Sequence, residues 1–549
     1  MSNPPTPDPR LVKAVESVVA ALEKSDQPLA VRLARGALDD GLAHPLFLNL
    51  RAFWHEGSGR AHEALADLEH AHRLAPEDVP VLNALGLALA RLQRHVDATK
   101  AFETATALQP DFVPAHFNHG WACEMWGELD RAQRSYEKAV ALNGSAPGAA
   151  EPLARLAVLA SRRGDWDETR SLAARTLELS PAHPIAHLMR TRADIQDGKF
   201  EAADQSLRQI LAWPKLSTHD RYEAMGALGD LRHRQERYAD AFAAYQTGNA
   251  EYGRTVASRY QGSASALDAV RWMHRYYENI PPADALPHRS ASASGEASCH
   301  VFLVGFIRSG TTLLEQVLAS HPDVTTMEEK EALEDSGMKF LGDARGLDLL
   351  RGLSDQERDT YVQAYWRRVR ELGFEPGGKI FVDKQPFNTV KLPLIAELFP
   401  QAKIIFAIRD PRDVLLSCMR RRFSVTALTY ELLEQDSAAR FYAAYMTLAE
   451  RLMQVLPLAF HRIRHEDLVD DFEGEVGKVC DFLGIAWTDA MRDFAERRKV
   501  RAISSPSAAQ IAKGLNREGI GQWRKYREQM APILPVLQPW VDRFGYPAA

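Results

Sequence analysis

Cysteine is scarce in this chain of 549 residues, and the few cysteines form no pattern. The four of them, Cys123, Cys299, Cys418 and Cys480, lie far apart, and no two have the C-x-x-C spacing. A disulfide scaffold or a zinc site normally needs closer sets of cysteines. The sequence therefore favours reduced thiols in a cytoplasmic protein over either of these.

Long apolar runs and a large excess of one charge are also lacking. No segment approaches the roughly 18 apolar residues of a membrane-spanning helix, so we expect no membrane span. The formal net charge is only -6, which argues against a nucleic-acid-binding coat but permits a local basic pocket. The N-terminus is rich in Pro and Asp and does not look like a signal peptide, so we expect a cytoplasmic protein.

The first half of the chain has an internal repeat. A spacing of 34 residues separates Gly86 from Gly120 and Phe102 from Tyr136, and two series of alanines keep the same step. This period resembles the tetratricopeptide repeat, in which each unit is a helical hairpin. We expect the small residues to let two helices approach closely, and the aromatic residues to fill the gap to the next hairpin.

We predict about seven such hairpins over residues 11–255. A stacked array of this kind presents a concave face that usually binds a protein or peptide. Taken alone, the array favours a scaffold or an oligomerisation module with no enzymatic role. Residues 256–298 are predicted to form a helical junction and linker, because Pro281-Pro282 and the Ser/Ala-rich run at 290–295 interrupt the pattern.

Residues 299–549 alternate between predicted strands and helices. Apolar runs at 300–306, 379–383, 403–408 and 461–464 are typical of strands, and they alternate with helical patterns at 311–320, 391–398, 414–421 and 438–456. Such alternation predicts an α/β domain with a parallel sheet flanked by helices, whose ligands bind at the carboxyl ends of the strands.

The loop at 305–312 follows the first of these strands and leads into a helix. Its sequence, Gly-Phe-Ile-Arg-Ser-Gly-Thr-Thr, has the frame of a phosphate-binding P-loop, but Thr311 occupies the lysine position. The strongest cation of the loop is Arg308, inside it. We therefore expect the loop to bind an anionic group without the lysine and magnesium arrangement of an ATPase.

Two further strand ends carry charged or polar side chains. Asp383 and Lys384 follow the second predicted strand. Arg409 follows the third, and Ser417 and Arg421 lie one i,i+4 step apart on the next helix. Two arginines and a serine around one point suit a phosphate dianion.

With these motifs the second half resembles the sulfotransferases, most closely the tyrosylprotein-sulfotransferase-like branch that occurs fused to tetratricopeptide repeats. The resemblance covers most of residues 300–549. The matching segments are 308–312, 383–388, 409–412 with Ser417, 505–510 and 521–526. The resemblance implies an enzyme that uses 3′-phosphoadenosine 5′-phosphosulfate (PAPS) as sulfuryl donor and needs no metal.

The resemblance also implies roles for individual residues. The 5′-phosphosulfate is expected to bind a loop set, and the 3′-phosphate a second set. Lys384 and Ser507 are expected to stabilise the transferring sulfuryl group, and Glu329, with Glu328 second, to deprotonate the acceptor hydroxyl. The loop set is Arg308, Ser309, Gly310, Thr311 and Thr312, and the 3′-phosphate set is Arg409, Ser417 and Arg421.

The acceptor stays open between protein tyrosine, a saccharide and a small molecule. His465 stands where the family commonly has a tyrosine, and Gln522 where it has a basic residue, so both donor contacts are left open. Two alternatives remain for the whole chain. One is a kinase-like phosphotransferase, disfavoured by the missing P-loop lysine. The other is a non-catalytic repeat scaffold with an inactive domain, disfavoured by the intact set of cations.

Overall fold

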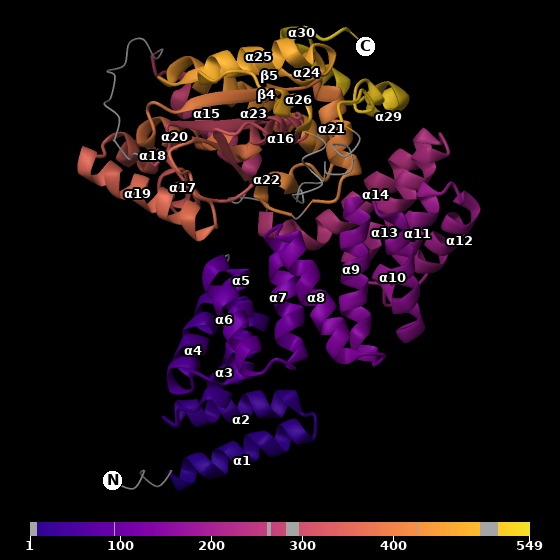
Figure 1. Ribbon diagram of the computed structural model, residues 1–549, viewed down its shortest axis with the longest axis vertical. Coiled ribbons are helices and arrows are strands. Elements are labelled where there is room, and N and C mark those ends of the chain that lie inside the picture. Colours follow the sequence, from indigo (N-terminus) through magenta and orange to yellow (C-terminus); the bar gives the residue numbers. More distant parts are fainter. Residues whose placement is uncertain are drawn as a thin grey trace. The chain divides into compact units, whose positions relative to one another are not determined.

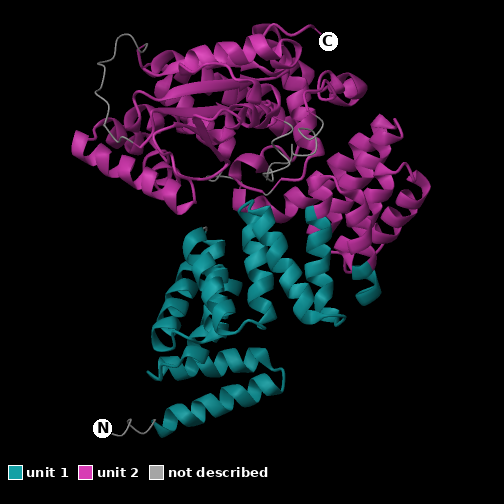
Figure 2. Ribbon diagram, viewed as in Figure 1, with its two compact units in different colours: residues 1–159, 175–181 teal, residues 160–174, 182–549 magenta. Residues whose placement is uncertain are grey.

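The computed structural model describes residues 8–92, 94–260, 265–281, 296–423, 425–494 and 514–548. The chain divides into two compact units, residues 1–159 with 175–181 and residues 160–174 with 182–549 (Figure 2). This division lies inside the helical array. The boundaries near 255 and 299 that the sequence suggested therefore stay a prediction.

Helices alone make up the described chain from 8 to 260, apart from a short 3-10 turn, η1 (Pro147–Ala149). Consecutive helices pack as pairs, for example α1 with α2 and α13 with α14. In none of the described ranges is a helix long and apolar enough to cross a membrane. The helices are α1 (Pro9–Glu23), α2 (Gln27–Asp39), α3 (Pro45–Gly57), α4 (Ala61–Leu74), α5 (Val79–Arg91), α6 (His95–Leu108), α7 (Val113–Met125), α8 (Leu129–Asn143), α9 (Ala150–Arg163), α10 (Trp166–Leu179), α11 (Pro184–Gln196), α12 (Phe200–Leu211), α13 (Thr218–Arg234) and α14 (Tyr238–Tyr260) (Figure 1).

Glycines let the two helices of a pair approach each other. A Cβ on Gly86 of α5 would lie 2.7 Å from the Phe102 ring of α6, and one on Gly120 of α7 would lie 2.7 Å from the Tyr136 ring of α8. The aromatic ring therefore fills the space inside its own hairpin. The Phe102 ring also lies 5.8 Å, centre to centre, from the ring of His119 of α7, so it reaches the next hairpin as expected.

A five-stranded parallel sheet lies at the centre of the second half, and this confirms the predicted fold class. Its order is β2 (Val324–Glu328), β3 (Ile380–Lys384), β1 (Cys299–Gly305), β4 (Lys403–Ile408), β5 (Ala459–Arg464). Each neighbouring pair is parallel. All five strands therefore end at the same edge, where the loop at 305–312 and Lys384 meet.

Helices and 3-10 turns surround this sheet. They are α15 (Ala266–Glu278), α16 (Thr311–Ala319), α17 (Glu334–Phe340), α18 (Ala344–Arg351), α19 (Asp355–Glu371), η4 (Pro386–Lys391), α20 (Leu392–Leu398), α21 (Pro411–Arg420), α22 (Ala427–Tyr430), α23 (Gln435–Val455), α24 (His465–Asp470), α25 (Phe472–Leu483), α26 (Asp489–Arg492), η6 (Gln522–Tyr526), α29 (Arg527–Met530) and α30 (Leu534–Arg543).

Sequence reasoning did not predict strand β2. Four of the five strands fall where the apolar runs placed them, whereas Val324–Glu328 carries two threonines and a glutamate and has no apolar run. It forms at the edge of the sheet, pairing only with β3. The omission matters, because this strand brings Glu328 opposite Lys384.

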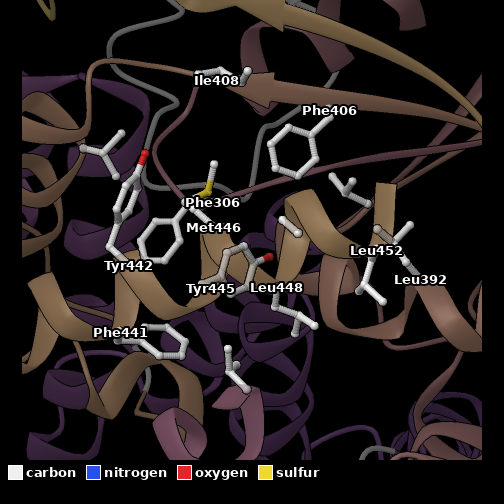
Figure 3. Packing of buried hydrophobic residues seen from close by; sticks show 14 of the residues in the cluster. Phe306, Leu392, Phe406, Ile408, Phe441, Tyr442, Tyr445, Met446, Leu448 and Leu452 are labelled. Atoms are coloured by element: carbon white, nitrogen blue, oxygen red, sulfur yellow. The ribbon is translucent and has the colours of Figure 1, made fainter. Parts of the chain in front are cut away.

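The two faces of the sheet are packed separately. Along β1, Val301 and Leu303 contribute to one apolar cluster, and Phe302 and Val304 to the other. Phe306, directly after β1, packs edge-on against the rings of Tyr442 and Tyr445 of α23 (Figure 3). The hydroxyl of Tyr445 donates to the Gly305 carbonyl at 2.9 Å and contacts the Pro386 carbonyl at 3.2 Å. This packing fixes the start of the 305–312 loop.

The glycine packing predicts the effect of one added methyl group. Gly86→Ala should lower the free energy of unfolding by about 1–3 kcal/mol, because the methyl group would overlap the Phe102 ring. Gly36 of α2 is the matched control, since its added Cβ would meet nothing within 4 Å. Gly36→Ala should instead raise stability by about 0.4–1 kcal/mol. Urea unfolding followed by circular dichroism measures both, and an unchanged midpoint for Gly86→Ala would contradict the packing argument.

Candidate functional site

The loop at 305–312 has an unusual backbone. Gly305 has a φ of +150°, and a Cβ there would lie 2.5 Å from the Ala407 carbonyl oxygen of the neighbouring strand, so a side chain is excluded. Gly310 has a φ of +91° and precedes α16 without supplying a capping side chain. Arg308 has a φ of +69° although it is not glycine. Such strain is retained where the surrounding structure imposes it, often at functional sites.

The start of α16 points its unsatisfied N–H groups at this loop. Ser309, Thr311 and Thr312 are all buried around that helix end. A helix N-terminus that follows a glycine-rich turn favours an anion. The five residues predicted to form the 5′ anion site, 308–312, are therefore adjacent and lie at the carboxyl end of β1.

Three arginines lie together beside the loop. Arg308 donates from Nε to Ser417 Oγ at 3.0 Å, and Arg409 donates to the Arg308 carbonyl at 2.9 Å. Burial, and then the charges of Arg421 and Arg409, lower the pKa of Arg308 to about 9. Burial also lowers the pKa of Arg421. A guanidinium keeps its proton in proteins, so the lowered pKa expresses the cost of burial and, after it, the repulsion among the arginines, both of which a bound anion would offset.

The two sets of residues that the sequence assigned to separate phosphates are therefore contiguous. Arg308 of the first set contacts Ser417 of the second. Arg409 also donates to the Gly519 carbonyl at 2.6 Å, while its Nε is buried without a hydrogen-bond partner in the described chain. Asp410 does not neutralise this cluster, because it forms a buried pair with Arg412.

Lys384 lies at the end of β3 and is completely buried. Its Nζ is 2.7 Å from Glu329 Oε1 and 3.4 Å from Glu328 Oε1. Burial disfavours its charge, but Glu329, Glu328 and Glu315 outweigh this and raise the pKa of Lys384 above its ordinary value. The structure thus brings together the lysine and both glutamates that the sequence singled out.

Glu329 is held in place by its backbone. Its N–H donates to the Lys384 carbonyl at 2.8 Å, which extends the pairing of β2 with β3 by one residue. Its φ is +46°, another strained value at a residue that is not glycine. The Glu329 side chain is 38% exposed, so a hydroxyl group can approach it from solvent while Lys384 stays covered.

Sequence reasoning missed Glu315. This residue of α16 is buried, accepts a hydrogen bond from Thr326 of β2, and accepts another from Gln316 at 2.6 Å. Burial and then Glu328 raise its pKa, while Lys384 opposes this rise. The signal was present, because Glu315 is the one carboxylate in the run Leu313–Leu318, whose other residues are apolar except Gln316.

Asp413 of α21 was also missed as an anchor for the C-terminal segment. Its carboxylate accepts from the Gly521 N–H at 2.6 Å and from the Trp523 N–H at 2.8 Å, and burial raises its pKa to about 6. The guanidinium of Arg412 stacks over the Trp523 ring at 4.1 Å. The segment at 521–526 is therefore tied to the same helix as Ser417.

His465 follows β5 and lies against the loop. A Cβ on Gly310 would be 2.6 Å from its Nδ1, which is buried without a partner in the described chain. Burial, then the charges of Arg409 and Arg308, lower its pKa to about 3, so the ring is neutral near pH 7. The structure therefore places His465 against the loop, and its contact with the donor stays open. Ser507 lies outside the described residues, as does the whole 505–510 motif.

The chain is similar to two known protein families. Residues 300–489 match the model of the sulfotransferase family, and residues 113–145 match a tetratricopeptide repeat. Protein-tyrosine sulfotransferase 1 of Danio rerio is 28% identical over 45% of this chain and 72% of its own length. Protein-tyrosine sulfotransferase A of Caenorhabditis elegans is 23% identical over 49% of this chain and 73% of its own length.

Other similarities cover smaller shares. An uncharacterized protein of Aquifex aeolicus is 24% identical over 43% of this chain, and the match spans only 32% of that protein. Among solved structures, a tetratricopeptide repeat protein from Parabacteroides merdae matches 44% of this chain and 93% of its own, with 16% identity and a TM-score of 0.35. A TM-score of this size defines no shared shape.

The arginine cluster predicts selective binding of anions. Pyrophosphate should raise the melting temperature more than sodium chloride of the same ionic strength, because it relieves the repulsion around Arg308. Arg308→Met should remove most of that excess, whereas Arg462→Met, at an exposed position of β5, should leave it unchanged. Differential scanning fluorimetry measures the shift, and equal shifts in all three proteins would rule out a specific site at the loop.

Proposed function

We propose that this chain, which belongs to the sulfotransferase family and carries tetratricopeptide repeats before its transferase domain, moves a sulfuryl group from PAPS to an acceptor hydroxyl. The observation that carries the proposal is the position of Lys384. A buried lysine bridged to Glu329 ends the strand beside an anion-binding loop. Charge stabilisation and proton removal are the two tasks that this transfer needs.

The residues present fit this donor. The 308–312 loop and the N-terminus of α16 suit its 5′ end, and Arg409, Ser417 and Arg421 suit its 3′-phosphate. The unpartnered Nε of Arg409 and the unpartnered Nδ1 of His465 are polar atoms at which an anionic ligand would supply a hydrogen-bond partner. Thr311 in place of the P-loop lysine leaves the loop without the cation of a nucleotide triphosphatase.

PAPS supplies an activated sulfuryl group, whose bond to the 5′-phosphate oxygen breaks as the acceptor oxygen forms its own. Lys384 offers a positive charge that burial shields from water, and it is proposed to stabilise the negative charge that develops during transfer. Glu329 lies at the exposed edge of the site and accepts the proton of the attacking hydroxyl. Ser507 is proposed to assist Lys384. We propose no metal in this reaction.

The acceptor is proposed to be a hydroxyl on a protein, a saccharide or a small molecule. A tyrosyl hydroxyl is the first to test, because the named relatives are protein-tyrosine sulfotransferases. The repeats are proposed to recruit a protein or peptide on their concave face, and the compartment is proposed to be the cytoplasm.

Donor specificity is tested by the product nucleotide. If 3′-phosphoadenosine 5′-phosphate (PAP) is present at ~100 times its dissociation constant, it should add about 2.7 kcal/mol of stability. Mg-ATP at the same concentration should add much less, because no lysine stands in the loop to bind its terminal phosphates. Thermal unfolding measures both. Stabilisation by Mg-ATP but not by PAP would favour the kinase alternative and overturn the proposal.

Removal of the base should affect turnover and not donor binding. Glu329→Gln should lower kcat by roughly 10²–10⁴-fold, the usual contribution of a general base, while the Kd for PAP stays near its wild-type value. Glu331→Gln is the matched control, since that carboxylate contacts Gln385 and Lys391 instead of Lys384. Transfer of ³⁵S-labelled sulfate to a panel of tyrosine peptides and glycans measures kcat.

A comparison of Glu328→Gln with Glu329→Gln decides which of the two neighbouring glutamates is the base. Glu328→Gln should retain activity if Glu329 is the base. Loss in Glu328→Gln with retention in Glu329→Gln would move the role to Glu328, and an unaffected rate in both would overturn the acid–base assignment.

A further inference from the structure

We propose that the helix pair α13–α14 of the repeat array forms part of the donor site. Asn249 of α14 is a positioning residue for Arg421 and Ser417, two of the side chains proposed to bind the 3′-phosphate. This inference rests on the proposed function. It concerns contacts inside one compact unit, residues 160–174 with 182–549, to which α13, α14 and α21 all belong (Figures 1 and 2).

Asn249 caps the end of α21 from another part of the chain. The last carbonyl groups of a helix have no partner within it. Asn249 is 1% exposed, and its Nδ2 donates to the Met419 carbonyl, in the last turn of α21, at 3.3 Å. Its Oδ1 accepts from Arg422, whose guanidinium also donates to the carbonyls of Met419 and Arg420 at 3.3 Å.

The array also shapes a receptacle for Arg422. Its guanidinium carbon lies 4.7 Å from the centre of the Tyr222 ring and 5.6 Å from that of Tyr245. A Cβ on Gly226 of α13 would lie 2.6 Å from Arg422 Nε, so glycine permits this approach. The Tyr222 ring is itself stacked on Tyr252 at 4.5 Å. The repeat pair thus clamps the residue directly after Arg421.

Charge complementarity points the same way. Asp230 of α13 favours the charged forms of Arg420 and Arg421, opposing the burial that disfavours both. Its Oδ1 accepts from the Tyr245 hydroxyl at 2.7 Å, which fixes the carboxylate in place. The repeat pair therefore supplies negative charge where three consecutive arginines, residues 420–422, follow one another across the end of α21.

The same pair also contacts the C-terminal segment over the donor site. His233 of α13 makes a hydrogen bond of 2.7 Å with the Tyr526 hydroxyl, and the two rings stack with an interplanar angle of 4°. Tyr526 belongs to η6, the segment that Asp413 of α21 anchors at its other end. The hairpin α13–α14 thus contacts both α21, which carries Ser417, and η6 beside it.

The position of Arg421 at the end of α21 explains why the Asn249 cap should affect binding of the 3′-phosphate more than binding of the 5′ end. Ser417 lies one turn before the end of α21, and Arg421 is the first residue beyond it. A shift of the uncapped end moves Arg421 directly. The loop at 305–312 is fixed at its start by Tyr445 and by the packing of Phe306, and it contacts α21 through Arg308 and Ser417, one turn before the end of that helix. Loss of the cap should therefore weaken the 3′-phosphate contact and spare the 5′ end.

The test compares two nucleotides in the full-length protein. PAP carries the 3′-phosphate and 5′-AMP lacks it, and isothermal titration calorimetry measures both Kd values. In Asn249→Leu the Kd for PAP should rise about tenfold while that for 5′-AMP changes by less than about twofold, as expected for weakening one hydrogen bond to a charged group. Arg421→Met should give the same selective loss. Kinetically, KM for PAPS should rise while kcat and the acceptor KM stay near wild type.

Asn118→Leu is the matched control. This asparagine of α7 also makes a side-chain hydrogen bond inside the array, to Asn83 at 2.9 Å. The substitution should leave the affinities for PAP and for 5′-AMP unchanged. If Asn249→Leu does not fold, Asn249→Asp replaces it, because aspartate keeps the acceptor for Arg422 and loses only the donor to Met419. Asn249→Asp should also weaken binding of PAP and not of 5′-AMP, with a smaller loss of PAP affinity than Asn249→Leu.

The outcomes distinguish failure of the positioning role of Asn249 from failure of the proposed donor. A wild-type protein that binds neither nucleotide would overturn the proposed donor. A wild-type protein that binds PAP, together with an Asn249 variant that binds both nucleotides unchanged or loses both equally, would overturn the positioning role alone.

Discussion

The site depends on one constraint, a lysine whose ammonium group is entirely removed from water at the end of a central strand. Such a charge is tolerated only when opposite charges and hydrogen bonds surround it. Lys384 obtains them from Glu328 and Glu329, at the end of the edge strand β2 and just beyond it, and from the field of Glu315 on α16. The edge strand, the first helix and the strand end are therefore coupled through the requirements of one cation.

The backbone accommodates this requirement at a cost. Among the described residues, four that are not glycine have a positive φ, and two of them are Arg308 and Glu329. They follow β1 and β2, on either side of β3, and each presents a charged side chain at the same edge of the sheet. Neither conformation is favoured locally. Both persist because strand pairing and core packing, especially around Phe306 and Tyr445, fix the chain on either side.

Much of this fold was predictable from local patterns. The loop, four strands and the small residues of the repeats all have signatures that lie within a few residues of one another. The features that were missed have long-range causes. Strand β2 has no apolar run and forms because β3 offers an edge, and Glu315 becomes important only when the sheet folds over α16. Asn249 contacts a carbonyl 170 residues away, and nothing in the sequence around it announces this.

The contacts of α13–α14 with α21 limit where such a chain can be divided in recombination or in protein engineering. Arrays of repeats are usually treated as interchangeable parts, lengthened or shortened by whole hairpins without harm to the adjoining domain. Here the terminal hairpin shares buried polar contacts with the α/β domain, so it has to be inherited together with that domain. The natural seam for recombination, or for grafting a different recognition array, therefore lies before α11, where the compact unit that holds α13, α14 and α21 resumes, and not after Tyr260.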